Sequence, residues 1–241
     1  MTVLVVTGTD TGVGKTVVTS AIAVLAVAAG RRVAVLKAAQ TGVKAAQTGD
    51  VDEVRRLVGP SVTCRELTRF PDPLAPATAA HRAGVPPVTP LAVAAAAREL
   101  AASHDLVLVE GSGGLLVYFD DTGGTIADAA AILGAPVLVV VRAALGTLNH
   151  TLLTVEALRT RALRCVGMVI GAWPVEPDLA ARCNRADLPA MTGLPLLGAL
   201  QEGAGCLSRA DFLPVARRGL EPGSPEDSCH GAGHGTWVGA H

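Results

Sequence analysis

A glycine-rich run near the amino terminus carries the strongest chemical signal in the chain. Residues 8–16 read Gly-Thr-Asp-Thr-Gly-Val-Gly-Lys-Thr and follow the apolar run 3–7 directly. Glycines let backbone N–H groups point at phosphate oxygens, and a following helix N-terminus adds partial positive charge. Lys15 is placed to reach the outer phosphates, and the Thr16 hydroxyl is placed to bind Mg²⁺. Although Gly8 stands one residue earlier than in the usual GxxxxGK[ST] pattern, the run predicts a loop that binds a nucleoside triphosphate.

A carboxylate follows a second apolar run. Residues 106–109 are Leu-Val-Leu-Val, and Glu110 comes next, before the glycine-rich residues 111–114. Mg²⁺ that is carried by nucleotide phosphates usually gains one or two protein carboxylates. An acid at the tip of a central strand, with glycines beside it, is placed to supply one. The alternative interpretation is a surface glutamate at the end of a strand.

A heptad of the sequence occurs twice in tandem. Lys37–Val43 and Lys44–Asp50 share six consecutive residues, Lys-Ala-Ala-Gln-Thr-Gly. Lys37 ends the apolar run 33–37, so it lies beside the phosphate loop if the two strands are neighbours, whereas no strand precedes Lys44. Lysine is a compact cation suited to an anionic intermediate. We therefore favour Lys37 as a catalytic residue over the alternative of a solvated lysine at a strand end.

Two predicted helix starts carry candidate ligands whose roles the spacing leaves open. Asp50 ends the second heptad and begins a helix, where it is a metal ligand or a plain N-cap, and Asp52 or Glu53 could take its place. The segment Leu145–His150 also begins a helix, so its free N–H groups and Asn149 could hold a carboxylate. Simple capping within that segment is an equal alternative.

These residues are positioned by an alternation of short apolar runs and alanine-rich segments with helical spacing. We expect strands at 3–7, 33–37, 106–110, 136–142, 165–170 and 196–200, and helices at 16–29, 51–58, 91–102, 126–133 and 149–162. The proline-rich residues 60–90 are expected to form an ordered excursion between elements. The alternation predicts an α/β fold, a P-loop NTPase-like and mostly parallel sheet with helices on both faces. Ligands bind such a sheet at the carboxyl ends of its strands, where the candidate residues lie.

Length and composition indicate one domain and a carboxyl-terminal tail. The chain has 241 residues, and we expect a single P-loop domain over 1–220. Residues 221–241 are rich in Gly, Pro, Ser and His, which favours disorder. Cys229, His230 and His234 are conceivable metal ligands, but no strand or helix is predicted there to fix their geometry.

Charge and cysteine usage exclude several classes of partner. The formal net charge is −1 and basic residues do not cluster, so neither a nucleic-acid nor a membrane partner is expected. The most apolar segment, 17–29, is too short to span a bilayer. Five cysteines without CxxC spacing argue against a disulfide framework and favour a cytoplasmic protein.

Together, the motifs resemble the dethiobiotin synthetase family over most of residues 1–215. The matching segments are GTDTGVGKT (8–16), VAVLKAAQTG (33–42), GD (49–50), LVLVEGSGGLLV (106–117), LGTLNHTLLT (145–154) and GMVIGAW (167–173). The resemblance implies that 7,8-diaminononanoate, CO₂ and ATP give dethiobiotin, ADP and phosphate. A carbamate forms on one amine and is phosphorylated by ATP, and the other amine then closes the ring.

The resemblance also assigns roles by position. It implies that the nucleotide is bound by Gly12, Val13, Gly14, Lys15, Thr16, Val17, Asp50, Glu110, Gly111, Ser112, Gly113, Gly171 and Ala172. Mg²⁺ would be held by Thr16, Asp50 and Glu110. The catalytic residues would be Lys15 and Lys37. Substrate contacts would come from Thr41, Gly146, Thr147 and Asn149, with the segment 145–149 reaching across the interface of a homodimer.

The chain departs from the family pattern at three places. Ala38 stands where a proline usually follows the catalytic lysine, and the repeated heptad changes the spacing from Lys37 to Asp50. Gly171-Ala172-Trp173 stands where many members carry an asparagine that reads adenine. The preference among nucleoside triphosphates is therefore open.

Two other functions use a similar loop. A partitioning or cell-division-site ATPase, a switch protein, carries a signature lysine five residues before the GKT lysine, where this chain has Asp10. An amide ligase of the cobyrinic-acid type brings a glutamine-hydrolysing domain with a nucleophilic cysteine. None of the five cysteines has such a setting, which argues against the amide ligase. Asp10 argues in the same way against the switch ATPase, and both functions are kept as alternatives.

Overall fold

The computed structural model describes residues 2–220, so the predicted tail and its candidate metal ligands lie outside the described residues. The strands are β1 Thr2–Gly8, β2 Val33–Lys37, β3 Gln40–Thr41, β4 Val62–Glu66, β5 Arg69–Phe70, β6 Leu106–Gly114, β7 Val137–Val141, β8 Cys165–Trp173 and β9 Leu196–Gln201. The helices are α1 Lys15–Ala28, α2 Asp50–Val58, α3 Pro76–Ala83, α4 Pro90–Ala101, α5 Ile126–Leu133, α6 Thr147–Thr160, α7 Leu179–Thr192 and α8 Arg209–Leu220.

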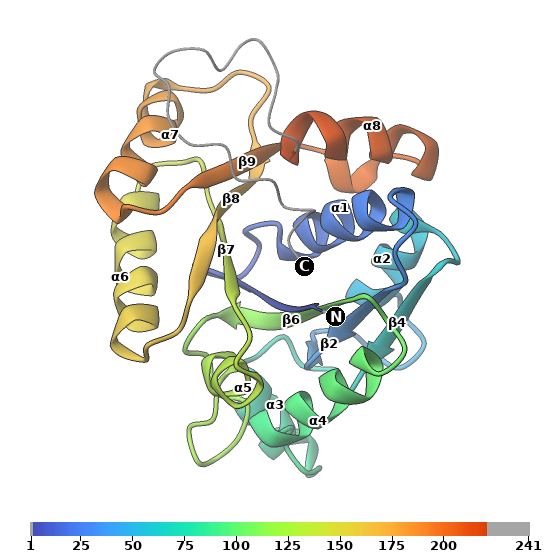
Figure 1. Cartoon of the computed structure of the whole chain (residues 1–241). Helices are drawn as coiled ribbons and strands as arrows, with labels where there is room; N and C mark the ends of the chain where they lie inside the picture. The colour runs from blue at the N-terminus through green and yellow to red at the C-terminus, as the bar shows by residue number, and fades with distance from the viewer. Residues whose placement is uncertain (1, 221–241) are drawn as a thin grey trace.

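A seven-stranded sheet in the order β4-β2-β6-β1-β7-β8-β9 lies at the centre of the molecule (Figure 1). All its pairings are parallel, which confirms the predicted fold class. β1 lies between β6 and β7, and β2 pairs with β6 so that Lys37 and Glu110 are register partners. The carboxyl ends of β1, β2 and β6 therefore meet at one edge of the sheet.

Helices cover both faces, as predicted. α1, α2 and α8 pack on one face and share a core cluster with Leu4 and Val6 of β1. α3, α4, α5, α6 and α7 contribute to the cluster on the other face, which contains Val5. Successive side chains of a strand point to opposite faces, so apolar residues in succession are what a sheet covered on both sides requires. Many of the helix contacts are made by alanine, which lets the helices approach the sheet closely.

Several elements were not anticipated from the sequence. Residues 60–90, expected to form an excursion, hold β4 at one end of the main sheet, β5 of a small second sheet with β3, and helix α3. α7 and α8 contain Pro189 and Pro214 within their helical spans, which weakens the helical pattern in the sequence. β6 also continues four residues past Glu110, the expected end.

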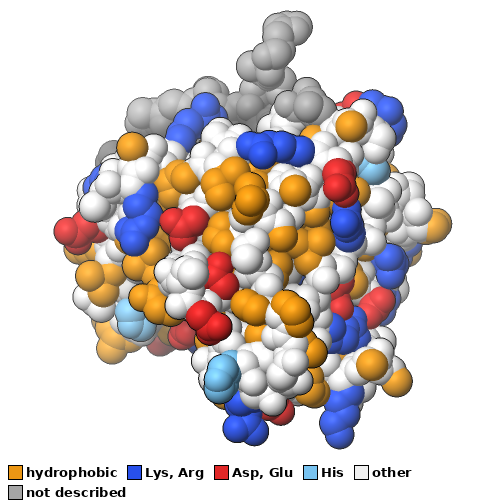
Figure 2. All heavy atoms as spheres, turned by 90° about the horizontal axis from the view of Figure 1, so that it is seen from below, with side chains coloured by type: hydrophobic (Ala, Val, Ile, Leu, Met, Phe, Trp, Pro, Cys, Tyr) orange, Lys and Arg blue, Asp and Glu red, His pale blue; other side chains and the backbone are white. Residues whose placement is uncertain are grey.

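One face of the molecule carries a mixture of side-chain types. On the face that Figure 2 shows, basic and acidic side chains are interspersed among apolar ones. Within residues 2–220, no helix is both long enough and apolar enough to cross a membrane.

Candidate functional site

The glycine-rich loop joins β1 to α1 and lies against β8. Gly12 and Gly14 have φ values of 71° and 93°, in the left-handed region that glycine adopts without strain. The backbone of Gly171 in β8 supports the loop so closely that a Cβ at this position would lie 2.0 Å from the Val13 carbonyl oxygen. Gly171, predicted as a nucleotide contact, is thus buried beneath the loop, while Val17 is half-buried in the first turn of α1.

Lys15, the first residue of α1, lies almost completely buried beside this loop. Its Nζ donates a hydrogen bond to the Asp10 carbonyl oxygen at 2.8 Å, so the side chain folds back along the loop. Burial, with the nearby positive charge of Lys37, lowers the pKa of Lys15 to about 8. The Lys15 ammonium is thus held beside the glycine-rich loop.

Lys37 is the centre of a buried cluster of charges. Its Nζ lies 2.6 Å from Asp50 Oδ2 and 2.8 Å from Glu110 Oε1, and it donates to the Gly111 carbonyl at 3.1 Å. Burial lowers the pKa of Lys37, but the charges of Glu110 and Asp50 outweigh burial and raise the pKa above its usual range. The Thr16 hydroxyl donates to the same Glu110 oxygen at 2.9 Å and joins the loop to the cluster.

The two copies of the heptad have different structures. In the first copy Lys37, Ala38, Ala39 and Gln40 are buried at the end of β2 and in β3. In the second copy the residues 44–48 are exposed, and the Lys44 N–H donates to the Gln47 side chain in a surface turn. The preference for Lys37 over Lys44 therefore agrees with where the two lysines lie.

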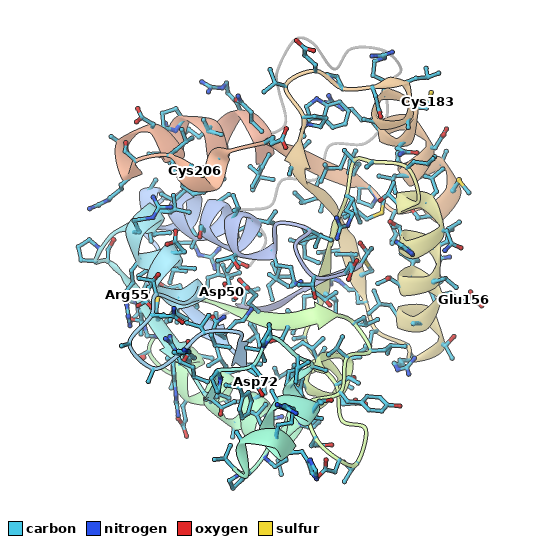
Figure 3. The ribbon with its side chains drawn as sticks, turned by 180° about the vertical axis from the view of Figure 1, so that it is seen from behind. Asp50, Arg55, Asp72, Glu156, Cys183 and Cys206 are labelled. Atoms are coloured by element: carbon cyan, nitrogen blue, oxygen red, sulfur yellow. The ribbon has the colours of Figure 1, made fainter. Side chains whose placement is uncertain are left out.

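The turn returns Asp50 to the cluster. Its backbone N–H donates to Gln40 Oε1 at 2.8 Å, and its carboxylate reaches Lys37. Figure 3 labels Asp50 at the start of α2. Asp50 is the first residue of α2 and Gly49 is the N-cap, so the N-cap alternative for Asp50 is wrong. The neighbouring acid Asp52 accepts a hydrogen bond from the Gly49 N–H at 2.8 Å. Glu53 instead forms a surface pair with an arginine one turn on.

The donor set around Lys37 has the chemistry of a magnesium site. A hydroxyl from Thr16 and carboxylates from Asp50 and Glu110 are hard oxygen ligands, the type that Mg²⁺ takes together with phosphate oxygens. Glu110 is 1% exposed, and Lys37 neutralises part of the acidic charge beside it. These residues therefore fit the metal ion that the loop motif implies.

Residues 111–113 complete the floor of this region. Gly111 and Ser112 are buried in β6, and the Ser112 hydroxyl donates to the Ala39 carbonyl oxygen next to Lys37. Gly113 has a φ of 69° and passes close to the Thr11 side chain. β6 is thereby tied both to the end of β2 and to the loop.

A cavity of about 380 Å³ opens beside the glycine-rich loop. It is lined by Gly12, Val13, Arg142, Ala143, Ala144, Ala172, Pro174, Glu176, Asp178, Ala181 and Glu202. Ala172 was expected in this place, whereas Arg142 and the three acidic residues were not identified from the sequence. They follow β7, β8 and β9, so the rule that ligands bind at the carboxyl ends of strands was the one available signal for them.

The expected substrate contacts lie in β3 and at the start of α6. Gly146 is the N-cap of α6 with a φ of 93°, the Thr147 side chain is buried, and Asn149 is exposed. Thr41 is half-buried in β3. Among the described residues, no hydrogen bond or ion pair joins these side chains to Lys37, Asp50 or Glu110.

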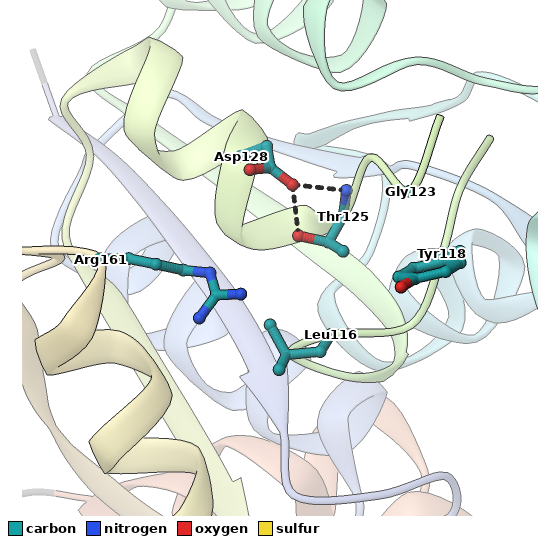
Figure 4. A pocket seen from close by; sticks show the side chains of 6 residues that line it. All are labelled: Leu116, Tyr118, Gly123, Thr125, Asp128 and Arg161. Carbon is teal, nitrogen blue, oxygen red and sulfur yellow. Dashed lines mark hydrogen bonds between the residues drawn. The ribbon is translucent and has the colours of Figure 1, made fainter. Parts of the chain in front are cut away.

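A second hollow, of about 370 Å³, lies elsewhere on the surface (Figure 4). It is lined by Leu116, Tyr118, Gly123, Thr125, Asp128 and Arg161. Asp128 accepts hydrogen bonds from the N–H and the hydroxyl of Thr125 at 2.8 and 2.6 Å, so its carboxylate caps α5. No residue of the charged cluster lines this hollow.

Comparison with known proteins places the chain in a family. A family model described as an AAA domain matches residues 2–206. The ATP-dependent dethiobiotin synthetase BioD of Saccharopolyspora erythraea is 64% identical over 222 residues, which cover 92% of this chain and 96% of that protein. The chain belongs to the dethiobiotin synthetase family. The BioD protein of Streptomyces avermitilis is 63% identical to this dethiobiotin synthetase family member, over 92% of this chain and 93% of that protein. The BioD protein of Mycobacteroides abscessus is 46% identical, over 92% of this chain and 96% of that protein.

Solved structures show how widely the fold of this dethiobiotin synthetase family member is shared. The septum site-determining protein MinD of Pyrococcus horikoshii, complexed with Mg-ADP, has a TM-score of 0.58 at 15% identity, with 90% of this chain and 92% of that chain covered. MinD of Aquifex aeolicus has a TM-score of 0.56 at 14% identity, with coverages of 90% and 88%. At this identity the likeness concerns the fold alone, so it does not favour the switch-ATPase alternative.

Proposed function

We propose that this chain catalyses the ATP-dependent formation of dethiobiotin in biotin biosynthesis, from 7,8-diaminononanoate and CO₂. Membership of the dethiobiotin synthetase family supports the reaction. The observation that carries the proposal is the Lys37 ammonium, buried between Glu110 and Asp50 and linked through Glu110 to Thr16 of the phosphate loop. This arrangement puts a fixed cation next to the place where a triphosphate would be bound.

The chemistry needs charge neutralisation more than covalent participation by the protein. CO₂ adds to one substrate amine as a carbamate, whose oxygen takes the γ-phosphoryl group from ATP. The second amine then attacks the carbonyl carbon, and phosphate leaves as the ureido ring closes. Lys15 and Lys37 stabilise the carbamate and the charge on the transferring phosphoryl group, which is the main catalytic demand in phosphoryl transfer.

Mg²⁺ is the second component of the proposed site. Thr16, Asp50 and Glu110 would hold it, and the ion would neutralise charge on the phosphates. The amides of Gly12–Thr16 bind the triphosphate, and residues 111–113 and 171–172 complete the nucleotide site. The 380 Å³ cavity beside Gly12 has the size of a small-ligand pocket and is the proposed position of the nucleoside.

The protein is proposed to act as a homodimer. Leu145 is 87% exposed and Leu153 is 56% exposed, and Leu116 and Tyr118 are exposed as well. Leu153 and Asn149 are four residues apart on α6 and so share a face of that helix. Burying this face against a second copy would cover the leucines and bring Gly146, Thr147 and Asn149 to the substrate carboxylate in the partner's site, opposite Thr41.

The proposal also covers the bounds of the domain, the cellular compartment and the partners. Residues 1–220 form the synthetase domain, and the protein works in the cytoplasm on small molecules without a nucleic-acid or membrane partner. The near-neutral formal charge of −1 supports this, because nucleic acids and anionic membranes select basic surfaces.

The deciding experiment measures phosphate release from Mg-ATP and bicarbonate-derived CO₂, with and without 7,8-diaminononanoate. We expect release to depend on the diamine and dethiobiotin to be detected by mass spectrometry. Slow release that is indifferent to the diamine would instead point to a switch-type ATPase. Replacing the diamine by a monoamine of the same length is the matched control, because it can form a carbamate but cannot close the ring.

A further inference from the structure

Arg142 lines the cavity assigned above to the nucleoside, and its side chain also ties the phosphate loop to the end of the neighbouring strand β7. It follows β7 directly, and its Nη2 donates to the Thr11 carbonyl oxygen at 2.8 Å and to Asp10 Oδ2 at 3.2 Å. The other Asp10 oxygen, Oδ1, accepts the Thr11 N–H at 2.7 Å. Asp10 is also the position at which the switch ATPases differ from this chain.

The contact with the Thr11 carbonyl fixes a peptide plane. The C=O and N–H groups of a trans peptide point in opposite directions, so a Thr11 oxygen held toward Arg142 turns the Gly12 N–H to the opposite side. Gly12 has a φ of 71°, and a Cβ built on it would have no other atom within 4 Å, so no side chain packs against this side of the residue. The hydrogen bond from Arg142 holds the Thr11 carbonyl oxygen on one side of the loop.

The base of Arg142 is itself anchored. The carbonyl oxygens of Ala143 and Ala144, the next two residues, accept hydrogen bonds at 2.8 and 3.2 Å from the side-chain amide of Asn184. Asn184 is 4% exposed and belongs to α7. The Arg142 side chain thus extends from an anchored stretch of backbone to the glycine-rich loop.

We propose that Arg142 is a positioning residue, which orients the Thr11–Gly12 peptide so that the Gly12 N–H is presented to the nucleotide phosphates. Asp10 acts through Arg142, because its carboxylate holds the guanidinium over the loop. Lys15 belongs to the same arrangement, since its Nζ donates to the Asp10 carbonyl oxygen. This inference rests on the proposed function only in requiring that ATP binds the loop.

The test compares ATP affinity, measured by calorimetry with Mg²⁺ and without the diamine, for the wild type, Arg142→Ala and Arg142→Lys. We expect Arg142→Ala to raise Kd for ATP roughly three- to tenfold, the usual effect of losing one hydrogen bond whose donor is partly exposed to solvent. Arg142→Lys should recover part of the affinity, because one ammonium can still donate to the Thr11 carbonyl. Arg82→Ala, which breaks the exposed pair with Asp72, is the control and should leave Kd unchanged.

Asp10→Asn separates positioning from a direct phosphate contact. Removal of an acid near a polyphosphate should strengthen binding by charge alone, and it would also free Arg142 to contact phosphate. If Arg142 positions the loop through Asp10, Asp10→Asn instead weakens ATP binding, and the double variant is no weaker than Arg142→Ala. Tighter binding by Asp10→Asn, or an unchanged Kd for Arg142→Ala, would overturn the inference. A tenfold fall in kcat of Arg142→Ala at unchanged Kd would also overturn it, because Arg142 would then act on the reaction and not on nucleotide binding.

The outcome is independent of the proposed reaction. Binding is measured without the diamine, so absence of diamine-dependent turnover would refute the proposed function and leave this result readable. The Gly12 amide resonance gives a direct readout of the peptide plane. It should shift on ATP binding in the wild type and much less in Arg142→Ala.

Discussion

At the scale of single residues, the environment of Lys37 explains how a lysine remains charged while 4% exposed. Burial alone favours the neutral amine, but Glu110 and Asp50 lie within 2.8 Å and 2.6 Å of its Nζ and favour the ammonium. Lys15, which has no carboxylate in contact, has instead a pKa lowered to about 8. Two lysines in one site thus differ in how firmly they keep their proton.

Replacement of Lys37 tests the catalytic assignment. Lys37→Ala is expected to lower kcat for dethiobiotin formation about 10²–10³-fold, the usual effect of removing one electrostatic stabiliser of the transition state. The heptad supplies a matched control in Lys44→Ala, which removes the same side chain from an exposed turn. Turnover of Lys37→Ala equal to that of Lys44→Ala would refute the assignment.

The low pKa of Lys15 makes nucleotide binding dependent on pH. Lys15 is charged below about pH 8 and loses its charge as pH rises through that value, whereas Lys37 stays charged. Phosphate groups lose their second proton near about pH 6, so they do not titrate in this window. We therefore expect ATP affinity of the free protein to fall between pH 7 and 9.5, as measured by calorimetry. An affinity that stays flat across this range would contradict the prediction.

Two neighbouring acids on α2 provide a paired test of the metal site. Asp50→Asn should raise the Mg²⁺ concentration needed for half-maximal turnover several-fold, because a proposed ligand loses its charge. Asp52→Asn keeps an oxygen that can accept the Gly49 N–H and should leave this concentration unchanged. Equal effects of the two substitutions would remove Asp50 from the proposed metal site.

The sequence was informative about residues that end strands and poor for those on loops. Lys37 and Glu110 could be placed because each ends an apolar run, and parallel neighbours bring such ends together. Asp50 could not be separated from Asp52, since the choice depends on the path of the surface turn before α2. The contact from Arg142 to Asp10 joins residues 132 positions apart and leaves no local pattern in the sequence.

At the scale of elements, the phosphate loop approaches β8 so closely that no side chain fits at Gly171. Gly171→Ala would bring a methyl group to 2.0 Å from the Val13 carbonyl oxygen, so the loop must move. We expect a loss of about 1–3 kcal/mol in the free energy of unfolding and a lower ATP affinity. Gly114→Ala is the control, because its methyl would meet the same loop at 3.6 Å, an ordinary contact. Thermal unfolding that fails to distinguish the two variants would argue against this packing.

Most strands and helices could be predicted because the apolar pattern persists through each of them. β2 and α5 have the expected bounds, and Gly134 ends α5 in the left-handed conformation typical of a helix stop. β4 was missed because its sequence, Val-Thr-Cys-Arg-Glu, has one fully buried residue and lies at the end of the sheet. Such a strand is defined by its pairing with β2, which only the tertiary structure supplies.

At the scale of the whole molecule, the proposed dimer can be tested on α6. Leu153→Asp places a charge on the proposed interface, so we expect the protein to elute as a monomer on size exclusion and to lose most of its turnover. Leu91→Asp changes a leucine that is 64% exposed on α4 and serves as the control. A Leu153→Asp protein that stays dimeric and active would place the interface elsewhere, and a monomeric wild type would remove the dimer from the proposal.

The likeness to MinD shows why the fold alone does not decide function. The two chains superpose over most of their lengths at 15% identity, so the sheet and the loop serve different proteins. In this chain the charged contacts of the site lie at or just after strand ends, with Lys37 beside Glu110 and Asp10 beside Arg142. Those positions, rather than the core, are where its chemistry was assigned.

The surface turn of the second heptad has a practical consequence for work on this protein. Residues 44–48 are exposed, and Gln40 of the first copy binds the Asp50 N–H. The position of Asp50 therefore does not depend on how many residues the turn contains. Lengthening a closed loop costs little, about 0.6 kcal/mol for each doubling. A short epitope or a fluorescent reporter grafted at residues 45–46 would therefore extend the turn before α2 and leave the contact between Gln40 and Asp50 in place.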